Sequence, residues 1–318
     1  MKKMKVEKMK ITLLGFIFLF VYGNANAQFG GIGRAVQRGA ERAVEKKVEK
    51  KTEEAVSKAL DDAEQKAKTD AEAKKEAAKN AEGTQDAKEK TEAKKIDTTP
   101  LFSEISSAPY TPSESEFTFF VMEKGAVQVF ANKDAKGKIT SKVRNTVMDI
   151  TGTKNAYAIT YQSELLDAKG KPANKDNSGI FNYRVIIKDD VIYFDLKEML
   201  GAIEGINDVD ASGTAMKIPN NLKVGQTLED ANAKVRIGVL NCTATLTERE
   251  CLAIEDITVG AGTFRCHKVS QKINSSALGV KNEGTTLTWY AKGVGAVKTE
   301  SYDKKGNLQS IQELVSNK

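Results

Sequence analysis

The only histidine of the chain, His267, directly follows Cys266, one of three cysteines. A structural zinc site needs four protein ligands, and a catalytic triad needs a nucleophile, a base and a residue that orients the base. Adjacent residues of a β-strand point to opposite faces of the sheet, so we do not expect Cys266 and His267 to share a pocket. We interpret His267 as a strand residue at a surface or interface. We predict no catalytic, cofactor-binding or metal-ligating residue.

The segment 132–137 has the partial spacing of a calcium-binding loop. Lys136 stands where that loop needs a ligand oxygen, and Val143 stands where it needs a bidentate glutamate. A turn explains the pattern better, because aspartate suits the first position of a type I turn and glycine suits the left-handed position that follows. The same hairpin turn is expected at residues 134–137, 167–170 and 303–306.

The cysteines are Cys242, Cys251 and Cys266. An odd number leaves at least one thiol unpaired. We expect a meander of the strands Lys234–Thr247, Cys251–Thr258 and Thr263–Ile273. In it, Cys242 and Cys266 flank the middle strand near the row of Glu255. Two strand spacings amount to ~9.5 Å, more than the ~7 Å that separates bridged Cα atoms. We predict that all three cysteines are free thiols.

From about Leu101 onward, β-branched and aromatic residues alternate with Gly, Asn and Asp turns. Further expected strands are Phe117–Met122, Val127–Ala131, Ser141–Thr151, Ala156–Leu165, Phe181–Lys188, Val191–Asp195, Thr285–Ala291 and Ala296–Tyr302. A short helix is expected at Leu196–Ala202. About a dozen short strands with frequent turns indicate one all-β domain. The fold class is mainly β: a single antiparallel domain over residues 98–318, either an open barrel or sandwich-like.

The single tryptophan, Trp289, shares its strand face with Leu287, and a buried indole removes a large apolar area from water. We therefore expect Trp289 to anchor the core.

The segments AGTFRCHKVS (Ala261–Ser270) and WYAKGVGAVKTESYDKKGNL (Trp289–Leu308) resemble the TapB-like family of exported bacterial β-domains. LKVGQTLEDA (Leu222–Ala231) is a weaker match to it. The resemblance covers roughly the C-terminal two-thirds of the mature chain. It implies an antiparallel, barrel-like or sandwich-like domain exported from the cytoplasm, and it brings no catalytic residues.

Residues 1–27 have the three parts of a signal peptide: five lysines, the apolar run Ile11–Tyr22, and the small-x-small sequence ending at Ala27. The apolar run is too short for the ~20 residues of a transmembrane helix. We predict cleavage after Ala27 and a mature chain without a transmembrane segment, in the periplasm or secreted. The five lysines and Glu7 account for +4 of the net charge of +6, leaving about +2. Nucleic-acid binding needs a basic face, which this balance does not supply.

Residues 28–97 are rich in Ala, Glu and Lys and predict a long charged α-helical tether, partly disordered. Apolar residues recur there at four-residue steps from Val36 to Leu60, forming a narrow stripe of small side chains. A coiled coil remains an alternative. Residues 33–51, with seven basic and three acidic side chains, could contact an anionic membrane surface weakly.

Three functions are compatible with these patterns. The first is a non-enzymatic binding module, in which the β-domain holds an apolar small molecule or an envelope partner and the loop Gly201–Asn221 acts as a lid. The second is a structural or interaction protein with a packed β-domain. The third is an enzyme, which we do not favour because His267 has no expected partner. No cofactor is predicted.

Overall fold

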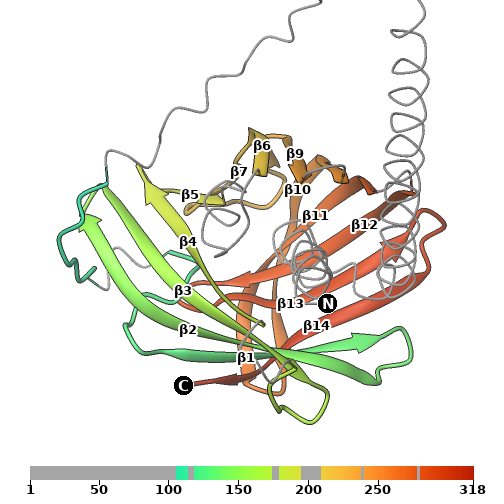
Figure 1. Cartoon of the computed structure of the whole chain (residues 1–318), viewed down its shortest axis with the longest axis horizontal. Helices are drawn as coiled ribbons and strands as arrows, with labels where there is room; N and C mark the ends of the chain where they lie inside the picture. The colour runs from blue at the N-terminus through green and yellow to red at the C-terminus, as the bar shows by residue number, and fades with distance from the viewer. Residues whose placement is uncertain (1–104, 114–117, 174–178, 195–208, 238–239, 278–279) are drawn as a thin grey trace, which may run out of the picture. The chain divides into compact units, whose positions relative to one another are not determined.

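The computed structural model describes residues 105–113, 118–173, 179–194, 209–237, 240–277 and 280–318 (Figure 1). The expected signal peptide (1–27), helical tether (28–97) and short helix (196–202) lie outside these residues. Within them, no helix is long and apolar enough to cross a membrane.

The described chain forms one sheet of fourteen strands, and each strand pairs antiparallel with its neighbours. The strands are β1 (Val127–Asp134), β2 (Ile139–Thr153), β3 (Ala156–Asp167), β4 (Ile180–Lys188), β5 (Val191–Phe194), β6 (Val209–Thr214), β7 (Met216–Pro219), β8 (Thr227–Leu228), β9 (Ala231–Ile237), β10 (Leu240–Val259), β11 (Gly262–Ala277), β12 (Val280–Ala291), β13 (Gly295–Asp303) and β14 (Leu308–Asn317). The mainly β, antiparallel fold class is confirmed for this part of the chain.

The sheet is a nearly closed barrel. Its order is β6-β9-β10-β11-β12-β13-β14-β1-β2-β3-β4-β5-β7, and β8 pairs with β10 beside this path. The two edge strands, β6 and β7, follow each other in the chain and are separated only by Ala215. In Figure 1 the green strands β1 to β4 and the orange and red strands β10 to β14 form opposite sides, and β6, β7 and β9 lie between them. Of the two architectures expected from the sequence, the barrel is therefore the one observed.

The three expected hairpin turns are confirmed, and they share one hydrogen-bond pattern. In the first, Asp134 Oδ1 accepts bonds from the backbone N–H groups of Lys136 (3.0 Å) and Lys138 (2.9 Å). The turns that begin at Asp167 and Asp303 repeat both bonds at 2.8–2.9 Å. The glycine at the end of each turn has a φ of 80–85°, a conformation that other residues adopt only under strain. Residues 132–137 thus form a turn between β1 and β2, not a calcium loop.

The strand expected over Lys234–Thr247 is wrong, because this stretch contains a turn. β9 ends at Ile237, and Ile237 pairs with Leu240 at the start of β10. Conversely, the break expected between Thr247 and Cys251 is a pair of irregularities inside the continuous strand β10. Glu248 has a φ of 48° there. An extra residue bends a strand and redirects its side chains, and the neighbouring Arg249 is buried as a result.

Two further expectations are corrected. Residues 209–219, assigned to a lid loop over Gly201–Asn221, form the edge strands β6 and β7 that bring the ends of the sheet together. The strand expected over Phe117–Met122 is not observed in the described residues 118–122, which form an irregular segment. Isolated hydrogen bonds connect these residues to the sheet, but they do not form a further strand of it. The reason is that this segment lies inside the barrel, away from any open strand edge.

The main core fills the barrel interior with side chains from both halves of the sheet. Inward positions alternate along the strands, as Phe181, Tyr183, Val185 and Ile187 on β4 show, since all four are buried in this core. Tyr157, Ile159, Ile192 and Ile218 are almost fully buried in this core. The packing leaves one part of the interior open.

Candidate functional site

The barrel interior contains a cavity of about 60 Å³ that is partly open to solvent. Ligand sites typically fall in the range of ~300–1,000 Å³, so a larger ligand would enter only if the lining side chains moved apart. The lining side chains come from β1 to β5, β7 and β11 to β14, and from the segment before β1. Apolar and uncharged polar residues share the lining. The uncharged polar ones come from β1, β2 and β11 to β14, strands that also contribute Phe130, Tyr290 and Ala296.

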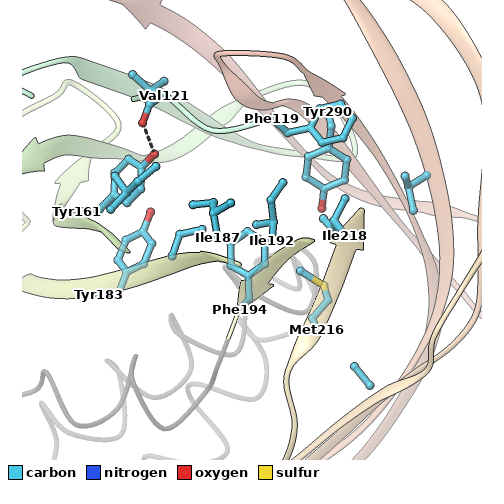
Figure 2. Packing of buried hydrophobic residues seen from close by; sticks show 14 of the residues in the cluster. Phe119, Val121, Tyr161, Tyr183, Ile187, Ile192, Phe194, Met216, Ile218 and Tyr290 are labelled. Atoms are coloured by element: carbon cyan, nitrogen blue, oxygen red, sulfur yellow. Dashed lines mark hydrogen bonds between the residues drawn. The ribbon is translucent and has the colours of Figure 1, made fainter. Parts of the chain in front are cut away.

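The first element of the site is the interior strap, residues 118–122. Gly293 N donates a hydrogen bond to Thr118 O (2.7 Å), and Tyr161 OH donates one to Val121 O (3.0 Å). The strap thus connects the β12–β13 turn with β3 inside the barrel. Phe119 is fully buried beside Tyr290, with 6.1 Å between the ring centroids, and Figure 2 shows this pair together. The strap closes part of the interior and leaves Phe120 on the cavity.

An aromatic wall lies on the side of β3, β4, β5 and β7. It consists of Phe120, Tyr161, Tyr183, Phe194 and Met216. The rings of Tyr161 and Tyr183 stack at 5.3 Å with 14° between their planes, and Phe120 meets Phe194 edge-on at 5.0 Å. Figure 2 shows Tyr161 and Tyr183 side by side. Burial raises the pKa of both phenols well above its usual range, so both stay neutral.

A polar wall faces it from β11 to β14, β1 and β2. Its members are Gln128, Asn145, Gln271, Thr288, Thr299 and Gln312. Gln128 Nε2 donates to Val294 O (2.8 Å) and to Asn317 Oδ1 (3.1 Å). Thr299 Oγ1 donates to Thr288 Oγ1 (3.3 Å). A core that had only to be stable would favour apolar residues at these inward positions, because each buried polar group must find a partner. The polar wall is therefore the part of the interior best explained by binding.

Arg249 supports the polar wall from behind. Its guanidinium donates from Nε to Gln271 Oε1 (3.2 Å), from Nη1 to Glu229 O (2.5 Å) and from Nη2 to Lys217 O (3.2 Å). Lys217 belongs to the edge strand β7, whereas Arg249 belongs to β10 on the other side of the gap in the sheet. Arg249, 1% exposed, thus joins the two ends of the sheet and fixes the Gln271 amide.

His267 and Cys266 point to different surroundings, as expected from their adjacent positions. The His267 ring meets Phe119 edge-on at 5.0 Å, and its Nδ1 is buried without a hydrogen-bond partner among the described residues. Burial lowers the pKa of His267, and the charges of Lys292 and Arg265 lower it further. Cys266 belongs to a second, smaller cluster. The described part of the chain contains no group of three His, Cys, Asp or Glu side chains that could hold a metal ion.

The free state of Cys251 and Cys266 is confirmed, and both thiols are buried. Cys266 pairs with Glu255, as expected. The position expected for Cys242 is wrong: it pairs with Ala277 at the far end of the β10–β11 hairpin, because β10 is one continuous strand. The Cys242 side chain lies outside the described residues. Burial raises the pKa of the Cys266 thiol to about 11, which makes it a poor nucleophile.

Trp289 is buried, but it does not anchor the main core as expected. It lies in the second cluster, with Cys266, Ala291 and Val297. The indole is flanked by Lys268 Nζ and Lys298 Nζ at 5.1 and 5.3 Å from its centroid, and its Nε1 donates to Glu255 Oε1 (2.7 Å). Strand alternation correctly separated Trp289 from Tyr290, but it could not show that the Tyr290 face is the inner one.

No cavity-lining residue was singled out from the sequence. The available signal was polar side chains at inward positions: Thr286 and Thr288 share a strand face with Tyr290. The spacing of Gln128, Gln271 and Gln312 along the chain gives no hint that they converge, because pairing across β11 to β14 and β1 brings them together.

The sequence matches the DUF3108-like family over residues 123–314, more than half of the chain. The chain belongs to the DUF3108-like family. The match begins directly after the interior strap and includes almost all of the polar and aromatic walls. No curated protein matches the chain.

Two solved structures share the fold. One is a candidate exported protein with a YmcC-like fold from Bacteroides fragilis, 22% identical, with a TM-score of 0.53. The other is a candidate lipoprotein from Parabacteroides distasonis, 25% identical, also with a TM-score of 0.53. Each alignment covers 64% of this chain and 99% of the other. Essentially the whole of each solved protein therefore aligns with about two thirds of this chain.

Proposed function

We propose that this DUF3108-like protein is an exported, non-enzymatic binding module that holds a small molecule with a substantial apolar part inside its barrel. The observation that carries the proposal is the interior cavity with its aromatic wall, since stacked rings offer a large apolar surface at little entropic cost. The nearly closed sheet gives this cavity a rigid frame.

The exported location is part of the same proposal. Two proteins of the same fold are described as a candidate exported protein and a candidate lipoprotein. Residues 1–27 have the pattern of a signal peptide, with cleavage after Ala27 and release into the periplasm or beyond. The narrower resemblance to TapB-like exported domains, based on Ala261–Ser270 and Trp289–Leu308, agrees with this location.

We also propose that the cavity carries out no chemical step. Its described lining contains Phe, Tyr, Met, Val, Ala, Gly, Gln, Asn and Thr, and none of these supplies a general acid or base near neutral pH. Its tyrosines Tyr161, Tyr183 and Tyr290 have pKa values raised by burial. We further propose that nucleic acid is not a partner and that residues 33–51 contact membrane surfaces only weakly.

Native mass spectrometry of the mature protein, purified from its own envelope, tests binding. We expect a discrete added mass that leaves on denaturation. Ala296, which lines the cavity, provides the variant: Ala296→Phe fills part of the space and should remove the added mass. Lys281→Phe, at an exposed position of β12, is the matched control and should retain it. A bare mass for the wild-type protein, together with no uptake of an added apolar fluorophore, would contradict the proposal.

The second candidate function is that of a structural or interaction protein. The observation that favours it is the interior strap, which already occupies part of the barrel with Phe119 and Val121. In this case residues 28–97 would reach an envelope partner. Deleting residues 28–97 should then abolish co-purification of that partner while leaving the thermal unfolding temperature of the β-domain (residues 98–318) unchanged. Loss of a bound small molecule, and not of a partner, would count against this candidate.

A further inference from the structure

The cavity offers no charge to a ligand. None of the described side chains on its lining is Asp, Glu, Lys, Arg or His. The buried cation nearest to this lining, Arg249, directs Nε to the Gln271 amide oxygen and its two terminal nitrogens to backbone carbonyl groups. An ionised ligand group would therefore lose its hydration without a direct ion pair to a described side chain of the lining, which is costly in a buried site.

Two amides of the polar wall have orientations that their partners determine. Arg249 can only donate, so the Gln271 atom that accepts from it is the oxygen, and the Gln271 NH₂ group remains available. Val294 O can only accept, so the Gln128 atom that bonds to it is the nitrogen, and the Gln128 oxygen remains available. Neither remaining group has a partner among the described residues. The polar wall thus presents one fixed donor and one fixed acceptor.

Next to Gln271 lie two hydroxyl groups that lack partners in the described part of the protein. Thr286 and Ser301 face each other across β12 and β13, and they are 1% and 5% exposed. Thr286 also pairs with Gln271 on β11. Buried polar groups are nearly always hydrogen-bonded, to protein, to water or to a bound molecule. The patch around Gln271 is therefore built for groups that both donate and accept hydrogen bonds.

We propose that the natural ligand is an uncharged amphiphile: its head group carries hydroxyl or amide groups that bond to Gln271 and to the hydroxyl groups of Thr286 and Ser301, and its apolar part lies on the aromatic wall of Tyr161, Tyr183 and Phe194. This inference rests on the proposed binding function and specifies its ligand class. A hydroxyl or amide group both accepts and donates, so it can pair with the Gln271 NH₂ and with the neighbouring hydroxyl groups. An ammonium only donates and would leave the Gln271 NH₂ unpaired, and a carboxylate or phosphate would bring a charge that no described side chain of the lining neutralises.

Isothermal titration with two probes of equal chain length tests the ligand class. Monodecanoyl glycerol carries two hydroxyl groups, and decanoate at pH 8 carries a negative charge. We expect the mature wild-type protein to bind monodecanoyl glycerol at least about tenfold more tightly than decanoate. Equal or tighter binding of decanoate would overturn the uncharged head group while leaving the binding function intact. Failure of both probes and of an apolar fluorophore would remove the binding function itself.

The polar wall is tested by Gln271→Glu. This change keeps the acceptor for Arg249 and replaces only the free NH₂ donor by a charged oxygen. We expect it to weaken monodecanoyl glycerol binding about tenfold. Gln162→Glu, which adds the same charge at a half-exposed site on β3, is the matched control and should bind like wild type. Thermal unfolding of both variants confirms folding. Unchanged affinity in folded Gln271→Glu would overturn the assigned head-group position.

Discussion

At the scale of single residues, Arg249 is the side chain on which closure of the sheet depends most. It is buried and donates to Gln271 Oε1 and to the backbone carbonyl groups of Lys217 and Glu229, on both sides of the gap. A second polar link across the gap, Lys217 to Glu229 at 2.8 Å, is an exposed ion pair. Such pairs contribute ~0–1 kcal/mol. The buried guanidinium is therefore the stronger connection.

We expect Arg249→Met to lower the free energy of unfolding by about 2–4 kcal/mol, because one buried and two part-buried acceptors lose their donor while the side-chain volume is largely kept. Urea unfolding measures the change. Lys272→Met, which removes the exposed pair with Glu248, is the control and should cost less than about 1 kcal/mol. Similar losses in both variants would show that the gap is not held by Arg249.

His267 makes stability depend on pH. Burial and the charges of Lys292 and Arg265 lower its pKa in the folded state, so the unfolded chain binds the proton more readily below about pH 6.5. This contribution is fully present above pH 6.5 and is lost as the pH falls. We expect the urea midpoint of the wild type to fall from pH 7 to pH 5, and the fall to be smaller in His267→Gln. Because His267 is the only histidine, parallel curves for both proteins would refute this assignment.

The buried thiols should resist alkylation in the folded protein. The pKa of Cys266 is about 11, raised first by burial and then by Asp256 and Glu255, and burial also raises the pKa of Cys251. Only the thiolate reacts, and at pH 8 it amounts to roughly one part in a thousand for Cys266. Peptide mass mapping after iodoacetamide treatment should find both residues unmodified, and modified once urea is added. Rapid modification of the native protein would contradict this burial.

At the scale of elements, the interior strap combines two roles in neighbouring residues. Phe119 is fully buried against His267 and Tyr290 and belongs to the core. Phe120, half-buried, faces Phe194 and lines the cavity. Strand alternation does not apply here, since the strap is irregular. The two side chains diverge because Thr118 O and Val121 O are fixed to opposite parts of the barrel.

These neighbours form a matched pair of variants. Phe119→Ala should lower the free energy of unfolding by about 3–5 kcal/mol, because it leaves a void in a packed core. Phe120→Ala should cost about 1–2 kcal/mol, because its ring is already partly solvated, and it should enlarge the cavity. Denaturant unfolding of both variants provides the comparison. If Phe120→Ala lowered the free energy of unfolding more than Phe119→Ala does, the assignment of Phe119 to the core and Phe120 to the cavity would be wrong.

At the scale of the whole molecule, the sheet is closed by side chains where backbone pairing stops. β6 pairs only with β9, and β7 pairs only with β5, so each leaves one edge unpaired in the described structure. Central strands such as β11 are paired along both edges. Closure by Arg249 and an exposed ion pair is weaker than closure by a continuous ladder of hydrogen bonds.

We therefore expect the gap to open before the rest of the barrel. In hydrogen exchange, the amides of β6 and β7 should exchange at least about a hundredfold faster than those of β11 and β12, since local opening needs less free energy than global unfolding. A bound amphiphile should slow exchange in β7, because Met216 lines the cavity. Uniform protection across all fourteen strands would show that the edges are joined more firmly.

The sequence by itself determined many of the strands, three of the turns and the separation of faces. The Asp-x-x-Gly turns are local, because the aspartate oxygen and the glycine φ act within five residues. Alternation separated Trp289 from Tyr290 and Cys266 from His267 for the same reason. Local spacing also excluded a calcium loop at residues 132–137.

Only the tertiary structure decided which face is inside and which residues meet there. Gln128 and Gln271 are far apart in the sequence. The pairing of β11, β12, β13, β14 and β1 places both of them on the cavity lining. Because β10 is one continuous strand, Cys242 lies far from Cys266. Because the sheet has a gap between β6 and β7, Arg249 lies where it joins the two ends of the sheet. These relations depend on strand register and sheet closure, which are set by contacts between residues far apart in the chain and leave no local pattern.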